Sequence, residues 1–348
     1  MSRDVGDRSA RDIPPLAIKA RGDDSARGLG YEKAMFETDP FVKLPLAFDA
    51  DALAEEVRAL PTRAWHPHPG KLPGNEAAFL VTTNGGLNED LTGPMAPTEF
   101  LRASPYTMHV MAAIGAVWGR TRLMKLAPGS VVPPHVDTNF YWRRHIRIHV
   151  PIITTPQVSF TCRQQTVHMA PGECWMFDTF SHHNVRNDSA EARVHLVMDT
   201  VGGERLWDMV ERAAAGEPAV AIPAGAGRAE DMAFEGLNDA SVMSPWELAH
   251  HVRFIADHAR PDPRLAMVLK RLDRFVAAWR GIWAQHGADA AGFADYRRLL
   301  QALDDDLPGL GGQQLLLRNQ LPVYRQIAEL IYTLDLPMTA AAPVRLAS

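Results

Sequence analysis

The sequence predicts an α+β protein with an antiparallel barrel or jelly-roll core, flanked by helices on its N-terminal side and followed by a helical C-terminal region. Short runs of strand-forming residues, separated by Pro, Gly, Asn and Asp clusters, predict the core within residues 121–200. Apolar residues at helical spacing lie before this segment and again after about residue 241. The 348 residues, of which 46% are hydrophobic and 22% charged, are typical of a folded protein of this kind.

The N-terminal part contains a polar segment and then a predicted helix. Residues 1–30 are rich in Arg, Asp and Gly and lack periodicity, so we expect them to be disordered. The barrel domain is predicted to span residues 31–213. Within it, residues 48–60 (FDADALAEEVRAL) have helical spacing of their apolar residues, and Asp49 or Asp51 can cap the first turn.

A second helix is predicted for the apolar segment 106–119 (YTMHVMAAIGAVWG), which is too short and too interrupted to cross a bilayer. No Gly-rich phosphate loop follows it. The strand-like runs come next, in this order: TRLMKLAP, IRIHVPIIT, QVSFTC, TVHMA, ECWMFD and ARVHLVMDT.

The C-terminal part is predicted to be a linker, residues 214–240, followed by a helical domain, residues 241–348. Ser244 to Glu247 combine a Ser N-cap, a Pro at the first helical position and a Glu three residues after the cap. Asp262-Pro263 opens another predicted helix, and residues 322–334 form a third. One face of the second helix is apolar and predicts core packing: Leu265, Val268, Leu269, Leu272, Phe275, Val276, Trp279 and Trp283.

Charge and cysteine content narrow the partners and the compartment. The formal net charge is −5 without a long Lys/Arg run, so neither nucleic acid nor an anionic membrane is an expected partner. Cys162 and Cys174 do not make a disulfide framework, and the N-terminus lacks the apolar core of a signal peptide. We therefore expect a cytoplasmic protein that acts on a small molecule or a peptide.

A candidate metal site comes from two histidines and an aspartate. His135 and Asp137 are two positions apart, so on an extended strand they present an imidazole nitrogen and a carboxylate oxygen on the same face. A 2-His-1-carboxylate site for Fe(II) needs one more imidazole and keeps open positions for a cosubstrate and O2. Both His182 and His183 satisfy the spacing. Ten residues after His183, Arg193 begins a strand with clear alternation, where an inward-facing guanidinium can bind a carboxylate through two hydrogen bonds.

A second strand has cationic and imidazole groups on one face. Arg147 and His149 alternate with Ile146, Ile148 and Val150 in the run IRIHVPI. Polar groups on the same face as the predicted ligands indicate an interior that accepts anions, which a purely structural barrel would not need.

The runs RLMKLAPGSVVPPHVD, RIHVPIIT, VHMAPGECWMFDT and HNVRN…ARVHLVMDTVGG together resemble the aspartyl/asparaginyl β-hydroxylase family of Fe(II)/2-oxoglutarate dioxygenases, which includes bacterial proline hydroxylases. The resemblance covers about residues 120–203, and its motifs agree in order, spacing and strand parity. It implies a double-stranded β-helix fold and hydroxylation with release of succinate and CO2. The cofactors implied are Fe(II), 2-oxoglutarate as cosubstrate and O2, with ascorbate as a candidate reductant.

The same resemblance assigns roles to the candidate residues. Iron is held by His135, Asp137 and His183, where the position of Asp178 favours His183 over His182. Arg193 pairs with the distal carboxylate of 2-oxoglutarate. Arg147 and His149 match the family's R-x-H strand, which helps to hold the cosubstrate. Because the animal aspartyl hydroxylases lack the iron-binding carboxylate, Asp137 indicates the bacterial branch. It also favours hydroxylation over chlorination, since a halide replaces that carboxylate in related halogenases.

Other polar residues keep simpler explanations. His168 and His195 are expected to be structural histidines with satisfied hydrogen bonds. Trp65, His66 and His68 are expected to pack in a loop, with a role in a substrate lid as the alternative.

Two further functions stay open at this level. One is a cupin-like metalloenzyme that does not use 2-oxoglutarate, and the other is a non-enzymatic jelly-roll binding protein. The identity of the substrate, free amino acid or peptide residue of the Asp, Asn or Pro type, is not determined by these motifs. The apolar helical stripes fit both a cover over the barrel and a homodimer interface.

Overall fold

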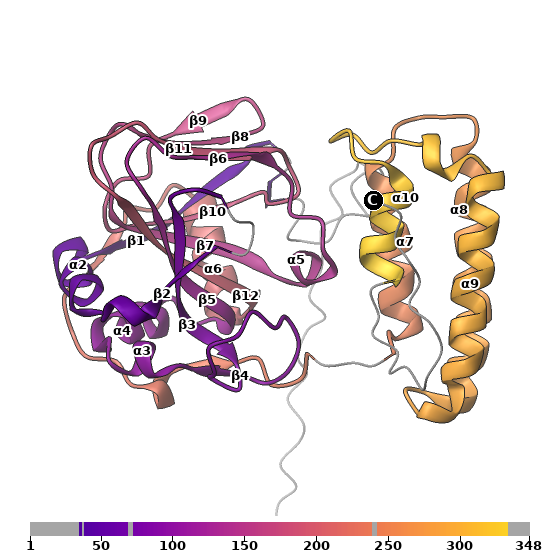
Figure 1. Cartoon of the computed structure of the whole chain (residues 1–348), viewed down its shortest axis with the longest axis horizontal. Helices are drawn as coiled ribbons and strands as arrows, with labels where there is room; N and C mark the ends of the chain where they lie inside the picture. Colours follow the sequence, from indigo (N-terminus) through magenta and orange to yellow (C-terminus); the bar gives the residue numbers. More distant parts are fainter. Residues whose placement is uncertain (1–34, 37, 69–71, 239–241, 333–348) are drawn as a thin grey trace, which may run out of the picture.

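The computed structural model describes residues 35–36, 38–68, 72–238 and 242–332, and Figure 1 shows a β-sheet body beside a separate group of helices. The predicted disordered segment, residues 1–30, lies outside the described residues. Within the part of the chain that is described, no helix is long and apolar enough to span a membrane.

Eight consecutive strands form the core of the sheet body. Four of them make the central part of a large sheet in the order β10-β7-β12-β5, and the other four make a second sheet in the order β6-β11-β8-β9. All of these neighbours are antiparallel. The strands are β5 (Val117–Leu126), β6 (Val131–His135), β7 (Ile146–Ile153), β8 (Val158–Cys162), β9 (Gln165–Val167), β10 (Glu173–Phe177), β11 (His183–Asn187) and β12 (Arg193–Gly202). This arrangement is a double-stranded β-helix, so the predicted fold class is confirmed.

The interior between the two sheets is apolar at one end. Its buried residues come from both sheets and from the neighbouring strand β1: Phe41, Leu126, Val158, Phe160, Cys162, Met169, Phe177 and Val185. Because Leu126 faces this interior, the alternation of side chains along β5 directs Arg122 and Met124 to the same side. The other end of the same interior is therefore lined by charged groups.

Further strands extend the large sheet beyond the predicted runs. β1 (Phe41–Phe48) and β13 (Val220–Ile222) lie at one edge, and β3 (Asn75–Thr83) and β2 (Trp65–Pro67) at the other. β4 (Met95–Pro97) pairs with β3, and β14 (Ala233–Phe234) pairs with β5. A linker was predicted for residues 214–240, but residues 214–238, the described part of this range, are more structured than that. β13 and β14 form backbone hydrogen bonds with β1 and β5, which their Ala/Gly/Pro-rich context does not indicate.

Helices cover the outer face of the large sheet. α2 (Ala50–Ala59) forms as predicted, with the Asp49 side chain accepting a hydrogen bond from the backbone N–H of Ala52. The helix predicted for 106–119 is too long. α4 (Pro105–Ile114) ends at Gly115, which adopts a left-handed φ of 70°, and the residues from Val117 onward join β5. α3 (Glu99–Arg102), η2 (Thr62–Ala64) and α6 (Glu204–Ala214) complete this layer.

The C-terminal helices enclose a second core. α7 (Pro245–His258) begins as predicted, with the Ser244 hydroxyl accepting from the N–H of Glu247. α8 (Leu265–His286) buries the predicted apolar face. α9 (Phe293–Gly309) was not predicted, because its buried residues Tyr296, Leu303 and Leu307 are widely spaced among charged ones. The remaining elements are η3 (Ala229–Asp231), before the helical part, and η4 (Ala290–Gly292), η5 (Gly312–Gln314), α10 (Val323–Ile327) and the π-helical turn η6 (Ala328–Tyr332) within it.

The helical part contacts the loops at one end of the barrel. The short helix α5 (Phe140–Arg144) follows β6, and its Phe140 packs against both cores. Arg144 forms an ion pair with Glu247 of α7. The Gln326 amide donates to the carbonyl oxygen of Thr138 at 3.0 Å. The helices therefore bind the loop that carries one of the predicted metal ligands.

Candidate metal centre

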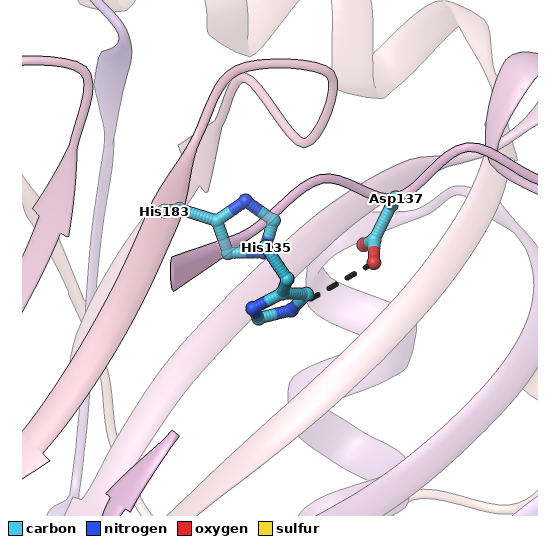
Figure 2. A group of neighbouring side chains, drawn as sticks. All are labelled: His135, Asp137 and His183. Atoms are coloured by element: carbon cyan, nitrogen blue, oxygen red, sulfur yellow. Dashed lines mark ion pairs between the residues drawn. The ribbon is translucent and has the colours of Figure 1, made fainter. Parts of the chain in front are cut away.

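Three predicted ligands meet at the end of strands β6 and β11. His135 is the last residue of β6, and His183, the first residue of β11, is its direct partner across the sheet. Asp137 follows in the loop after β6. One donor atom of each residue lies within 4.8 Å of the others, and Figure 2 shows the two imidazoles beside the carboxylate. Two imidazoles and one carboxylate are the donor set that suits a non-heme Fe(II) site with open positions.

The backbone orients both imidazoles. The Nδ1 atom of His135 lies 2.9 Å from the Pro133 carbonyl oxygen, and Nδ1 of His183 lies 2.9 Å from the carbonyl oxygen of Ser181. Each Nδ1 can carry the proton and donate it to that carbonyl, which leaves the Nε2 lone pair for a metal. Burial lowers the pKa of His183 to about 4, so this ring is neutral at pH 7.

Asp137 reaches the site by a different route from the one predicted. We expected His135 and Asp137 to share one face of a strand, but β6 ends at His135. The loop position of Asp137 is fixed by its backbone N–H, which donates to the carbonyl oxygen of Thr179 at 3.0 Å. Strand parity alone therefore does not place this carboxylate. The neighbouring His182 turns to the helical part, where its Nε2 lies 2.8 Å from the carbonyl oxygen of Asn319.

Arg147 holds the carboxylate of Asp137. Its Nη1 donates to Asp137 Oδ2 and its Nε to Asp199 Oδ1, each at 2.9 Å. Its guanidinium also lies over the Trp142 ring, 4.1 Å from the centroid. Burial alone lowers the pKa of Arg147, but Asp199 and Asp137 outweigh it and raise that pKa. In this arrangement Arg147 orients the candidate ligand Asp137. The remaining guanidinium nitrogen of Arg147, Nη2, has no hydrogen-bond partner among the described residues.

A second polar group lies deeper in the barrel. Arg193 is only 4% exposed, and its Nε and Nη2 atoms have no hydrogen-bond partner among the described residues. The same holds for both ring nitrogens of His149 and of His195, whose rings lie 5.7 Å apart. The expectation that His195 is a satisfied structural histidine is therefore wrong, because no donor or acceptor of the surrounding strands reaches it. His168, in contrast, has Nδ1 at 3.1 Å from the Val158 carbonyl oxygen.

The charges of this deeper group, Arg193 with His149 and His195, favour the binding of an anion. Burial lowers the pKa of Arg193 to about 9, and burial together with Arg193 lowers the pKa values of His149 and His195 well below the usual range. The guanidinium is thus charged at pH 7 beside neutral imidazoles. His149 connects it to the metal centre, because its ring lies 5.3 Å from Phe177, which is 5.0 Å from His183.

The sequence reasoning missed two arginines on β5. Arg120 and Arg122 are buried, and each has a guanidinium nitrogen 3.8 Å from the same carboxylate, Glu89. Burial, with Arg120 and Arg147 nearby, lowers the pKa of Arg122 to about 9. The alternation in GRTRLM was a signal for them, because these arginines share the parity of the interior-facing Leu126.

The cluster upstream of the barrel divides between packing and the site. Trp65 and His66 lie in strand β2 and not in the expected loop; the His66 ring stacks on Phe79 at 5.2 Å, and Lys125 lies over the Trp65 ring. His68 differs. Burial and the charges of Arg122, Arg120 and Arg147 lower its pKa to about 4, and because Arg147 binds Asp137, His68 lies near the metal centre.

Residues 78–202 match the family model described as aspartyl/asparaginyl beta-hydroxylase, a segment that runs from β3 to the end of β12 and contains all the candidate ligands. The resemblance inferred from the sequence motifs is thereby confirmed for this part of the chain.

Solved structures give weaker likenesses. A 2OG-Fe(II) oxygenase family oxidoreductase from Burkholderia pseudomallei is 16% identical with a TM-score of 0.36, covering 49% of this chain and 90% of that one. A prolyl-4-hydroxylase from Pseudomonas putida is 14% identical with a TM-score of 0.33, covering 47% and 92%. HygX from Streptomyces hygroscopicus, solved with nickel and 2-oxoglutarate, is 13% identical with a TM-score of 0.34, covering 49% and 86%. Likenesses this low carry no argument about the present chain.

Proposed function

We propose that this chain, which carries an aspartyl/asparaginyl β-hydroxylase family domain in residues 78–202, is an Fe(II)/2-oxoglutarate-dependent oxygenase that hydroxylates an amino acid or a residue of a peptide. The observation that carries the proposal is the meeting of His135, Asp137 and His183 within 4.8 Å. This donor set fits Fe(II) and leaves coordination positions for a cosubstrate and O2. A closed structural zinc site would instead use four protein ligands.

The surroundings of the ligands fit 2-oxoglutarate as well. A dicarboxylate needs a cation beyond the metal, and the unpaired guanidinium of Arg193 has two nitrogens available for a bidentate hydrogen bond. His149 and His195 lie beside it and can donate or accept through neutral rings. A cupin-like enzyme without this cosubstrate would have no need of a buried, unpaired arginine at this place.

With Fe(II) and 2-oxoglutarate bound, the centre would supply oxidative hydroxylation of a C–H bond, with release of succinate and CO2. The protein residues then have separate tasks. The carbonyl oxygens of Pro133 and Ser181 hold the imidazoles in the tautomer that presents Nε2. Arg147 orients the carboxylate of Asp137, because it donates a hydrogen bond to one of its oxygens. The apolar side chains between the sheets keep bulk water from the buried Arg193, His149 and His195.

The β5 arginines support a substrate that bears a carboxylate. Arg122 is 5% exposed, and its ion pair with Glu89, at 3.8 Å, is shared with Arg120. Asp199 and Glu89 both act to raise the pKa of Arg122, but burial and the neighbouring arginines still lower it to about 9, so the buried guanidinium favours a further anion. Free amino acids and aspartyl side chains both provide one, so we propose substrates of the Asp, Asn or Pro type that carry a carboxylate near the reacting carbon.

The test uses purified protein with Fe(II), 2-oxoglutarate, ascorbate and O2, and a panel of free amino acids and peptides. We expect succinate release stimulated by some members of the panel and a product that has gained one oxygen atom. Asp137→Ala should abolish the iron-dependent release. Absence of succinate with the whole panel, or full activity in Asp137→Ala, would refute the proposal.

A direct binding measurement separates this proposal from the cupin-like alternative. Under anaerobic conditions, Fe(II) and 2-oxoglutarate should produce a charge-transfer absorption band in the wild-type protein. If the band forms with the same 2-oxoglutarate affinity in Arg193→Met, the assignment of Arg193 is wrong. If Fe(II) neither binds nor stabilises the protein, the non-enzymatic alternative is favoured.

A further inference from the structure

A cleft of about 1020 Å³ lies where the helical part meets the barrel loops. One wall comes from residues 142–146, 163–164 and 177–182 of the β-sheet body. The other comes from α7 and residues 318–320. Figure 1 shows α7 and α10 standing beside α5, at the side of the sheet body that these loops occupy. None of the residues assigned above to Fe(II) or 2-oxoglutarate lines this cleft.

Two residues that line the cleft make hydrogen bonds with candidate metal ligands. Thr179 and Ser181 line the cleft, and their carbonyl oxygens bind the backbone N–H of Asp137 and Nδ1 of His183. Trp142 also lines it, with its ring against Arg147. A molecule bound in the cleft therefore lies against the same loops that position the candidate ligands.

The two walls are held together by specific contacts. The Phe180 ring, on the loop before β11, lies 4.7 Å from the Phe254 ring of α7. The Asn319 side chain donates to the Phe180 carbonyl oxygen at 2.9 Å, and the Asn319 carbonyl oxygen faces His182. These contacts form the cleft within a single chain, so a ligand does not need to assemble it.

The charged residues of the cleft are mainly cationic. Arg143, Arg253 and Arg318 line it, the first with its guanidinium 3.6 Å from the centre of the Phe254 ring. Arg163 also lines it but is paired with Asp178 at 2.7 Å. Asp257 is the other carboxylate in the lining. Among the described residues that line the cleft, four arginines thus face two carboxylates, and the histidines add hydrogen-bond donors.

We propose that this cleft binds an acidic peptide segment flanking the residue that is presented to the metal centre. The inference rests on the proposed function and deepens it, because it makes the substrate a peptide. Pockets of about 300–1,000 Å³ already enclose drug-sized ligands, so the cleft has room for several residues. Carboxylate side chains match the exposed guanidiniums of Arg253 and Arg318.

The experiment measures binding of fluorescently labelled peptides by anisotropy, with the full-length protein and no metal added, so that the result does not depend on catalysis. The peptides have one central Asp and acidic, neutral or lysine-containing flanks. The protein variants are Arg253→Glu, the double variant Arg253→Glu/Arg318→Glu and Arg274→Glu, a single charge reversal at an exposed position of α8 outside the cleft that matches Arg253→Glu.

We expect the acidic peptide to bind best to the wild-type protein and its affinity to fall with salt concentration. The double variant should lose about tenfold in affinity, since it replaces two cations that would pair with acidic side chains by anions that repel them, while Arg274→Glu should bind as the wild type does. Equal binding of the acidic and lysine-containing peptides, or equal loss in Arg274→Glu, overturns the inference. Succinate release from a free amino acid, together with no peptide binding, would overturn the cleft inference and leave the oxygenase proposal standing. Loss of all iron-dependent succinate release would count against the oxygenase itself.

Discussion

Replacing Arg193 by Met is expected to have opposite effects on stability and on cosubstrate binding. The guanidinium is 4% exposed and two of its nitrogens have no hydrogen-bond partner among the described residues. Burial lowers its pKa to about 9, a drop that corresponds to a penalty on the order of 5 kcal/mol for keeping the charge. Because the pKa in the folded state lies below that in the unfolded chain, the penalty is fully present at pH 7 and is relieved only above about pH 9. Met fills a similar volume without the charge, so the ligand-free variant should be more stable by about 1–4 kcal/mol.

The same substitution should weaken 2-oxoglutarate binding at least about thirtyfold, because a buried charge pair with the distal carboxylate contributes roughly 2–5 kcal/mol. Urea unfolding at pH 7 measures the first effect, and the shift of the unfolding midpoint on adding Fe(II) and 2-oxoglutarate anaerobically measures the second. The control is Arg186→Met, which removes an exposed arginine of β11 that forms an ion pair with Asp188. A ligand-free Arg193→Met less stable than wild type, or one that keeps the full 2-oxoglutarate shift, would refute the reasoning.

Three further predictions concern the ligands, the acid stability and the contact between the two parts. Asp137→Ala should lower Fe(II) affinity by at least about tenfold in an anaerobic titration, and retention of wild-type affinity would exclude Asp137 as a ligand. His251 is 2% exposed, and burial lowers its pKa to about 3, so on acidification this histidine is protonated first in the unfolded chain. Between pH 6.5 and 5 the free energy of unfolding, measured with urea, should fall by up to about 2 kcal/mol because of this residue. His251→Leu should remove that part of the fall. Gln326→Leu removes the amide that donates to the Thr138 carbonyl and should weaken Fe(II) binding several-fold with the midpoint of urea unfolding almost unchanged, whereas an unaltered Fe(II) affinity would show that the helices do not position the ligand loop.

Much of the barrel could be predicted because its strands are short, alternate clearly and are separated by turn residues. The run from Arg193 to Asp199 has the predicted parity in β12, with Arg193 in the interior. The end of the helix before β5 could not be placed in the same way. The apolar segment 106–119 continues through Gly115, and only the left-handed conformation of that glycine shows where helix changes to strand. The strands β13 and β14 were hidden for another reason, since they are held by pairing to distant strands rather than by their own composition.

The sequence predicted which residues form the candidate site, but not the contacts that position them. Spacing indicated His135 and Asp137, and the interval to Arg193 together with the family resemblance favoured His183 over His182. In the structure, donor atoms of His135, Asp137 and His183 do meet. The sequence could not show that Asp137 leaves the strand, or that its position depends on Arg147 and on the backbone of Thr179. These are contacts between residues far apart in the chain, and they follow from the closure of the barrel.

The arginines of the barrel interior differ in one property that residue type and parity cannot reveal, namely whether the fold itself neutralises them. Arg147 has two carboxylates at 2.9 Å, so its charge is balanced and its task is to hold a neighbour. Arg193 forms no ion pair with a carboxylate of the described residues, and Arg122 shares Glu89 with Arg120 at 3.8 Å. A buried charge without a partner destabilises a fold unless something else binds it. Among the described arginines of the barrel interior, Arg193 and the Arg120–Arg122 pair are therefore the places where the fold leaves positive charge to be balanced, and they are the places proposed above for the cosubstrate and for a carboxylate of the substrate.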